Sequence, residues 1–89
     1  MATNFPNPFS GSTIIPYELP APAQVSLRVY DIAGRLVRML EENASRKVGR
    51  HDVAWNGHDA HGRPLPPGVY LCRLDAGGKT ATRRLTLLK

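Results

Sequence analysis

Apolar and polar residues alternate along several short stretches of this chain, with the two-residue period that is typical of β-strands. The clearest stretch is residues 24–30, where Val25, Leu27 and Val29 fall on one face and polar residues fall on the other. Residues 51–55 repeat the alternation. No stretch shows the longer period of an amphipathic helix clearly, so the pattern predicts strands joined by turns.

Apolar runs that are bounded by turn residues indicate further strands. We expect them at residues 13–19, 35–41, 68–76 and 79–89. Pro16 confines the first of these to a sheet edge or a bulge, because proline has no N–H group to donate. Residues 35–41 do not alternate strictly, which favours a bulge or burial of both faces, although the period alone would also allow a helix. Residues 42–49 are polar and predict a loop, and the proline-rich residues 4–9 predict an extended lead-in.

Glycine and aspartate mark the expected turns. Two adjacent glycines between the last two strands predict a two-residue hairpin, because both positions of a type I′ turn need a positive φ. The pattern Asp-x-x-Gly-Arg occurs twice, and in it the Asp side chain accepts nearby backbone N–H groups while the Gly closes the turn. The residues assigned to these turns are Asp31, Gly34, Asp59, Gly62, Gly77 and Gly78.

About six short strands with regular turns in 89 residues predict an all-β fold, an antiparallel immunoglobulin-like β-sandwich of about six to seven strands. A chain of this length forms one domain, so we assign residues 1–89 to a single module, with residues 1–3 as a flexible or expression-derived lead-in. Trp55 is the expected anchor of the core. Cys72 is the single cysteine, and its place in an apolar strand predicts a buried thiol.

Charge and hydropathy narrow the class of function. Twelve Lys and Arg against seven Asp and Glu give a net charge of +5, but the basic residues are scattered among the acids. Nucleic-acid sites concentrate basic and aromatic residues on one element, so we expect no nucleic-acid partner. No apolar stretch approaches the ~20 residues of a membrane-spanning helix, so we expect no transmembrane segment.

Candidate chemistry is sparse. His58, Asp59 and His61, with His51 and Asp52 nearby, suggest metal ligands, but they lie in a loop where their spacing fixes no geometry. A calcium ion at Asp59 would need several backbone oxygens as further ligands. No serine lies in a nucleophile elbow, and no pair of carboxylates has a recognisable cleft. We therefore expect neither a metal nor a cofactor, and we expect that the protein is not an enzyme.

Taken in order, the turns and strands resemble a known family. The resemblance is carried by Asn-Pro-Phe at residues 7–9, by the strand and turn pattern of residues 25–40, by residues 49–62, by Gly-Val-Tyr at residues 68–70 and by the basic and apolar end at residues 84–89. Their order and spacing resemble the C-terminal sorting domains of type IX secretion cargo. They are also similar to the immunoglobulin-like domain of the flagellar hook-capping protein.

This resemblance implies a non-catalytic sorting and surface-anchoring module at the C-terminus of a larger secreted bacterial protein. Its partners would be the outer-membrane secretion machinery and the passenger domains of its own full-length chain, and the isolated module would be monomeric. It would act outside the cell or on the bacterial surface, after export through the periplasm. The sorting-signal candidates that the resemblance carries over are Asn7, Pro8, Gly68, Tyr70, Arg84, Leu85 and Lys89.

Two other roles stay open. One is an accessory adhesion or carbohydrate-binding module of an extracellular enzyme, although strand phase predicts that Tyr17, Tyr30, Trp55 and Tyr70 face inward. The other is an assembly domain of the hook-capping kind, which would act through an unpaired sheet edge. Gly68 and Tyr70 also have a purely structural explanation, because they would begin and fill a core strand.

Overall fold

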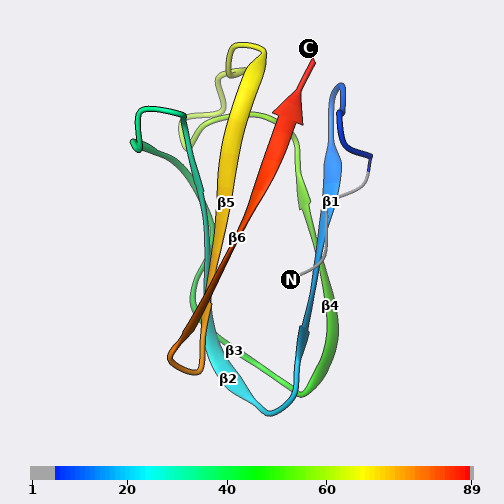
Figure 1. Ribbon diagram of the computed structural model, residues 1–89, viewed down its shortest axis with the longest axis vertical. Helices are drawn as coiled ribbons and strands as arrows, with labels where there is room; N and C mark the ends of the chain where they lie inside the picture. Colours follow the sequence, from blue (N-terminus) through cyan, green and yellow to red (C-terminus); the bar gives the residue numbers. More distant parts are fainter. Residues whose placement is uncertain (1–5, 89) are drawn as a thin grey trace.

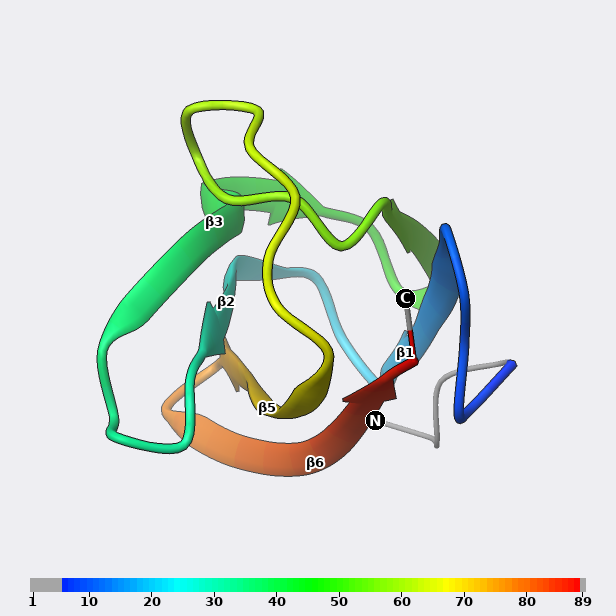
Figure 2. The ribbon, with the colours of Figure 1, turned by 90° about the horizontal axis from the view of Figure 1, so that it is seen from above.

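The computed structural model describes residues 6–88, which form six β-strands and, within that range, no helix. The strands are β1 (Thr13–Leu19), β2 (Ala23–Tyr30), β3 (Leu36–Arg46), β4 (Gly49–Trp55), β5 (Gly68–Ala76) and β6 (Lys79–Leu87). Antiparallel pairing gives a two-stranded sheet, β1-β4, and a four-stranded sheet in the order β3-β2-β5-β6. The smaller sheet lies across from the larger one, which curves around the core (Figures 1 and 2). This architecture confirms the predicted antiparallel sandwich.

The strand predictions hold to within two residues except at β3; β4 begins at Gly49, before the predicted residue 51, and β6 ends at Leu87, before the predicted residue 89. This strand continues to Arg46, so most of the loop predicted at residues 42–49 is wrong. The register of β3 against β2 shifts at three places, which explains the irregular alternation that the sequence shows. The polar residues beyond Glu41 lie on an edge strand and pair through their backbone, so their polarity does not indicate the strand.

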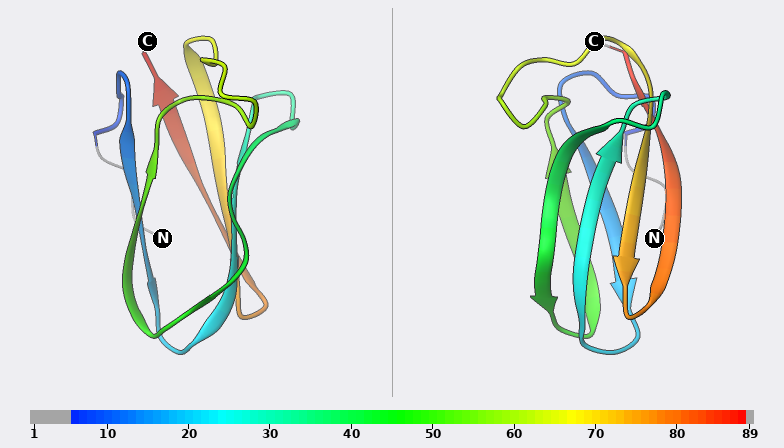
Figure 3. Two further views of the ribbon diagram at one scale, coloured as in Figure 1. Left: turned by 180° about the vertical axis from the view of Figure 1, so that it is seen from behind. Right: turned by 90° about the vertical axis from the view of Figure 1, so that its left-hand side faces the viewer.

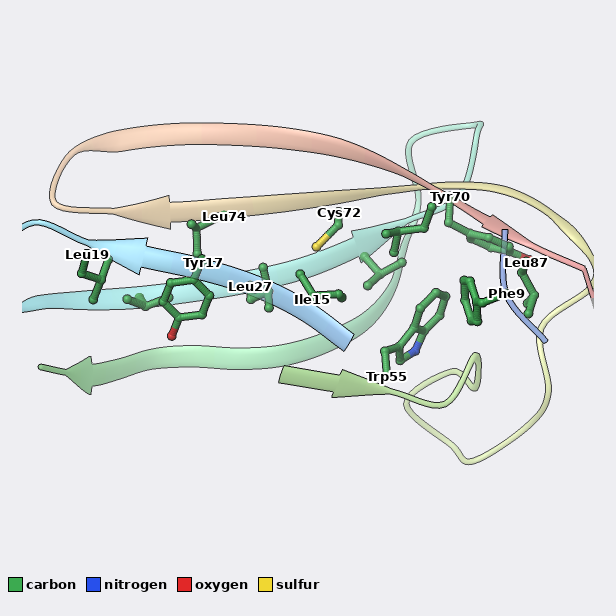
Figure 4. Close-up of a cluster of buried hydrophobic side chains, with 13 residues drawn as sticks. Phe9, Ile15, Tyr17, Leu19, Leu27, Trp55, Tyr70, Cys72, Leu74 and Leu87 are labelled. Carbon is green, nitrogen blue, oxygen red and sulfur yellow. The ribbon is translucent and has the colours of Figure 1, made fainter. Parts of the chain in front are cut away.

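One hydrophobic core runs between the sheets (Figure 4). Trp55 is 1% exposed, and its ring lies 5.7 Å from that of Phe9 and 5.8 Å from that of Tyr70, which confirms it as the core anchor. Phe9 is buried as deeply as Trp55, which the extended lead-in predicted for its segment did not anticipate. The buried hydrophobic residues are Phe9, Ile15, Tyr17, Leu19, Val25, Leu27, Val29, Trp55, Tyr70, Cys72, Leu74, Leu85 and Leu87.

The two Asp-x-x-Gly-Arg turns have the same geometry. Asp31 Oδ1 accepts the N–H groups two and four residues further on, at 3.0 and 2.9 Å, and Asp59 Oδ1 does the same at 2.9 and 3.0 Å. Gly34 and Gly62 close the turns with φ values of 86° and 79°. These backbone hydrogen bonds hold the pKa of each aspartate below its ordinary value. The largest contribution comes from the N–H of Arg35 at Asp31 and from the N–H of Arg63 at Asp59.

The two ends of the sandwich differ. At one end, residues 7–9 lie beside the last residues of β6, and we call this the closed end (residues 7–9, 68–70 and 84–88). At the other end β1 and β6 diverge, and we call this the open end (residues 19–23 and 76–81). It contains the predicted two-residue hairpin, with φ values of 56° at Gly77 and 78° at Gly78. Figure 3 shows that β6 ends on the same side of the sandwich as the β2–β3 loop and the β4–β5 connection.

Candidate functional site

The candidate residues gather at the closed end, although they come from distant parts of the sequence. Within the described part of the chain these are Asn7, Pro8, Gly68, Tyr70, Arg84 and Leu85, while Lys89 lies outside it. Tyr70 pairs with Leu85 across β5 and β6, and Gly68 pairs with the last residue of β6. The fold therefore brings the N-terminal segment, the start of β5 and the end of β6 into one region.

Asn7 attaches the N-terminal segment to the end of β6. Its Oδ1 accepts the N–H of Thr86 at 3.0 Å, and its Nδ2 donates to the carbonyl oxygen of Arg84 at 3.4 Å. Two residues later the backbone continues this pairing. The N–H of Phe9 donates to the carbonyl oxygen of Thr86 at 3.0 Å, and the N–H of Leu88 donates to the carbonyl oxygen of Phe9 at 2.8 Å. The Asn side chain and one residue of backbone thus cover the edge of β6 at its end.

Tyr70 and Leu85 belong to the core that supports this surface. They are 5% and 0% exposed, and the Tyr70 hydroxyl donates to the carbonyl oxygen of Pro66 at 2.5 Å. Burial raises the pKa of Tyr70 above its ordinary value, and the Asp31 carboxylate adds to this shift. Gly68 begins β5 with a φ of 151°, a conformation that side chains rarely adopt. Tyr70 and Leu85 therefore support the closed end from within, whereas Asn7, Pro8, Gly68 and Arg84 are exposed on it.

Arg84 lies on the outer face of the four-stranded sheet. Register places it beside Leu71, which in turn lies beside Tyr30, so the three form a row across β6, β5 and β2. Leu71 is 37% exposed and Tyr30 is half-buried. Arg84 has no ion-pair partner among residues 6–88. The row is a partly exposed surface of a tyrosine and a leucine, and it ends in an arginine with no ion-pair partner in the described part of the chain.

Two members of this row were not predicted from the sequence. Tyr30 was expected to face inward, which is wrong, because Tyr30 follows the inward Val29 and therefore lies on the opposite face. Leu71 was predicted only as part of the strand at residues 68–76. Since Tyr70 and Cys72 face the core, strand phase alone places Leu71 outside, and this phase is the observation that would have found it.

A second unpredicted feature is a polar bridge between the sheets. The Tyr17 hydroxyl on β1 donates to Glu41 Oε1 on β3 at 2.7 Å, and the guanidinium of Arg46 pairs with the other carboxylate oxygen. Glu41 is only 9% exposed. Burial, reinforced by the hydrogen bond to Glu41, raises the pKa of Tyr17 to about 12. The ring of His51 stacks on Tyr17 with 5.2 Å between centroids. The partners lie far apart in sequence, so no local motif announces the bridge.

Two of the residues considered for metal binding take part in structural hydrogen bonds. Asp59 Oδ1 accepts the backbone N–H groups of its turn, and the backbone carbonyl oxygen of His58 accepts the indole N–H of Trp55 at 3.0 Å. Residues 6–88 contain no group of three or more His, Cys, Asp or Glu that could hold a metal ion. Burial raises the pKa of the Cys72 thiol to about 12, so it is protonated at neutral pH. No helix within the described range is long and apolar enough to cross a membrane.

Comparisons with known proteins connect this geometry to a family and to two solved structures. The sequence model of a family described as the FlgD Ig-like domain matches residues 4–80. PorZ of Porphyromonas gingivalis, described as an essential bacterial surface component of the type IX secretion system, superposes with a TM-score of 0.65 at 21% identity, over 97% of this chain and 11% of PorZ. FlgD of P. aeruginosa superposes with a TM-score of 0.62 at 25% identity, over 84% of this chain and 59% of FlgD.

The chain thus spans less than two thirds of either protein. No curated protein sequence matches it. PorZ, at its low identity, shows a similarity of fold alone.

Proposed function

This chain belongs to the family of FlgD Ig-like domains, and we propose that it is a non-catalytic C-terminal sorting and surface-anchoring module of a secreted bacterial protein. In this proposal the type IX secretion machinery recognises the module. Its partners in this role are the outer-membrane machinery and the passenger domains of its own full-length chain. It acts outside the cell or at the bacterial surface, after export through the periplasm. The family is in general non-enzymatic, in keeping with a binding module.

The observation that carries the proposal is the arrangement of the closed end. Asn7 and Pro8 are exposed beside the last residues of β6, and Arg84 ends the exposed row that Leu71 and Tyr30 begin. Tyrosine and arginine are enriched where proteins recognise one another, and a partly exposed leucine between them adds apolar area. The buried rings beneath keep this surface rigid, which reduces the entropy lost on binding.

A second candidate function is an assembly domain like that of the hook-capping protein. It is favoured by the family match and by the 25% identity to FlgD over 84% of this chain. Such a domain would dock through sheet edges rather than through the closed end. A carbohydrate-binding role has less support, because Tyr17, Trp55 and Tyr70 are buried and supply no exposed aromatic row.

The test fuses residues 1–89 to the C-terminus of a fluorescent reporter that carries an export leader. The fusion is expressed in a bacterium with the type IX apparatus and in a strain that lacks the apparatus, with the reporter alone as control. We expect surface exposure or release of the fusion only where the apparatus is present. Retention of a folded reporter in the periplasm of both strains would contradict the sorting role and would favour the assembly domain.

A further inference from the structure

Among residues 6–88, the edge of β6 is covered along only half of its length. At the closed end, Thr86 exchanges hydrogen bonds with residues 7–9 on the side away from β5. N–H and C=O groups of alternate residues in an antiparallel strand point to the same side, so Thr80 and Thr82 direct theirs to this same edge. Within residues 6–88 no strand pairs with them. The Thr82 carbonyl oxygen accepts a hydrogen bond from the guanidinium of Arg83, at 2.8 Å.

An apolar groove lies beside this free edge. It has a volume of about 390 Å³ and lies between the β1–β2 turn and the β5–β6 hairpin, where β1 and β6 diverge (Figure 1). A groove of this size accepts one or two apolar side chains. The residues that give it its apolar character are Leu19, Pro20, Pro22, Leu74, Ala76 and Ala81.

The side chains along the free edge have a definite charge pattern. Lys79, Ala81 and Arg83 are alternate residues of β6, so they share the face that turns toward the core and the groove. Lys79 and Arg83 are exposed, and Ala81 lies between them in the groove wall. Glu18 lines the groove from β1 and is its one acidic residue within the described chain. Along this edge, the side chains at alternate positions 79, 81 and 83 are therefore basic, small and basic.

A strand laid along this edge would place alternate side chains opposite these three positions. Opposite charges stabilise directly facing cross-strand pairs, and the groove beside Ala81 favours an apolar side chain. The complementary pattern is an acidic residue, an apolar residue two positions on, and a second acidic residue two positions further. No two acidic residues of this chain are four positions apart, so a second copy does not provide the pattern.

We propose that the free edge at Thr80 and Thr82, with the adjoining groove, binds an extended segment of another protein that carries acidic, apolar and acidic side chains at alternate positions. The segment adds as a fifth strand next to β6 and displaces the Arg83 guanidinium from the Thr82 carbonyl oxygen. This inference goes beyond the sorting role and uses other residues. Basic edge residues also prevent aggregation between sheets, but that role demands no particular register in a bound peptide.

The first test titrates the 89-residue protein with the capped peptide Thr-Glu-Thr-Val-Thr-Glu-Thr and follows the backbone amide resonances. We expect the largest shifts at Thr80 and Thr82. Binding of Thr-Lys-Thr-Val-Thr-Lys-Thr, and of the rearranged Thr-Glu-Thr-Glu-Thr-Val-Thr, should be weaker by roughly tenfold. No binding, equal binding of the three peptides, or shifts confined to other strands would overturn the proposal.

Two sets of variants locate the site. The double variant Lys79→Glu/Arg83→Glu should reverse the preference and bind the lysine peptide more tightly, and an unchanged preference would overturn the charge pattern. Thr82→Pro removes an N–H from the free edge and should weaken binding roughly tenfold, whereas Thr82→Ala keeps it and should bind like the parent. Charge reversal at two exposed side chains leaves the core untouched, so this test stands even if the proline variant fails to fold. We expect the double charge variant and Thr82→Ala to leave surface delivery of the reporter fusion unchanged. The edge proposal and the sorting proposal can therefore fail separately.

Discussion

The closed and open ends of the sandwich share β6 but treat it differently. At the closed end, Asn7 and Phe9 cover its edge, and aromatic rings pack beneath it with centroids 5.7 and 5.8 Å apart. At the open end no strand among residues 6–88 pairs with its edge, apolar side chains line a groove, and a polar bridge joins Tyr17 on β1 to Glu41 on β3. Figure 4 shows the buried side chains that connect the two ends, from Leu19 and Tyr17 to Trp55 and Phe9.

The edge of β6 is therefore covered by contacts at one end of the sandwich, and not along the whole strand. One Asn side chain and one residue of backbone convert a free edge into a covered one, and the rings make that end rigid. A rigid, covered end presents side chains from its outer face, whereas a free edge presents its backbone. The two ends are therefore suited to different partners.

The largest expected effect comes from the core of the closed end. Trp55→Ala should lower the free energy of unfolding by about 3–5 kcal/mol, because it removes the ring that contacts Phe9 and Tyr70. Leu74→Ala at the open end should cost only about 2 kcal/mol, because its surroundings already border the groove. Urea unfolding of both variants measures the difference. An equal or larger loss for Leu74→Ala would contradict the contrast between the ends.

The polar bridge is the next largest contribution to test. Tyr17→Phe removes a hydrogen bond to a buried carboxylate and should cost about 1.5–3 kcal/mol, toward the lower value because Arg46 still pairs with Glu41. Tyr30→Phe is the matched control, since Tyr30 lies on the outer face, and it should leave the stability within about 0.5 kcal/mol. Equal losses in the two variants would show that the bridge does not stabilise the open end.

A smaller effect separates the two halves of the β6 edge. Asn7→Ala should cost about 1 kcal/mol and should speed hydrogen exchange at the Thr86 amide, while Thr82 at the free edge exchanges as before. Asn7→Asp keeps the oxygen that accepts from Thr86 and should restore most of the protection there. Unchanged exchange at Thr86 in the alanine variant would show that Asn7 does not close this edge.

The smallest effect is a dependence of stability on acid pH. Backbone hydrogen bonds lower the folded pKa of Asp31 and Asp59 below the ordinary value of 3.8, so the charged forms stabilise the folded state. That stability is present above the unfolded pKa and is lost as the pH falls through the lower folded values. In Asp31→Asn/Asp59→Asn, unfolding measured from neutral pH to about pH 2 should show a shallower loss. A slope equal to the parent's would contradict this origin.

Local patterns predicted most of the fold, because alternation and turn chemistry act within a few residues. The hairpin at Gly77 and Gly78 and the two aspartate turns followed from such rules. The second half of β3, the burial of Phe9 and the bridge from Tyr17 to Glu41 did not, because each depends on contacts with distant strands. The candidate residues were found from a resemblance, and the structure separates the buried ones, Tyr70 and Leu85, from the exposed ones.

The central claim is that the closed end, and not β6 as a whole, carries the recognition surface. The most direct measurement compares Arg84→Ala with Arg83→Ala in the reporter fusion, because the two arginines are adjacent, both exposed, and on opposite faces of the strand. Unfolding measurements first establish that both variants are folded. We expect Arg84→Ala to lower surface delivery at least about tenfold and Arg83→Ala to leave it unchanged. Equal delivery by both variants, or a loss confined to Arg83→Ala, would contradict it.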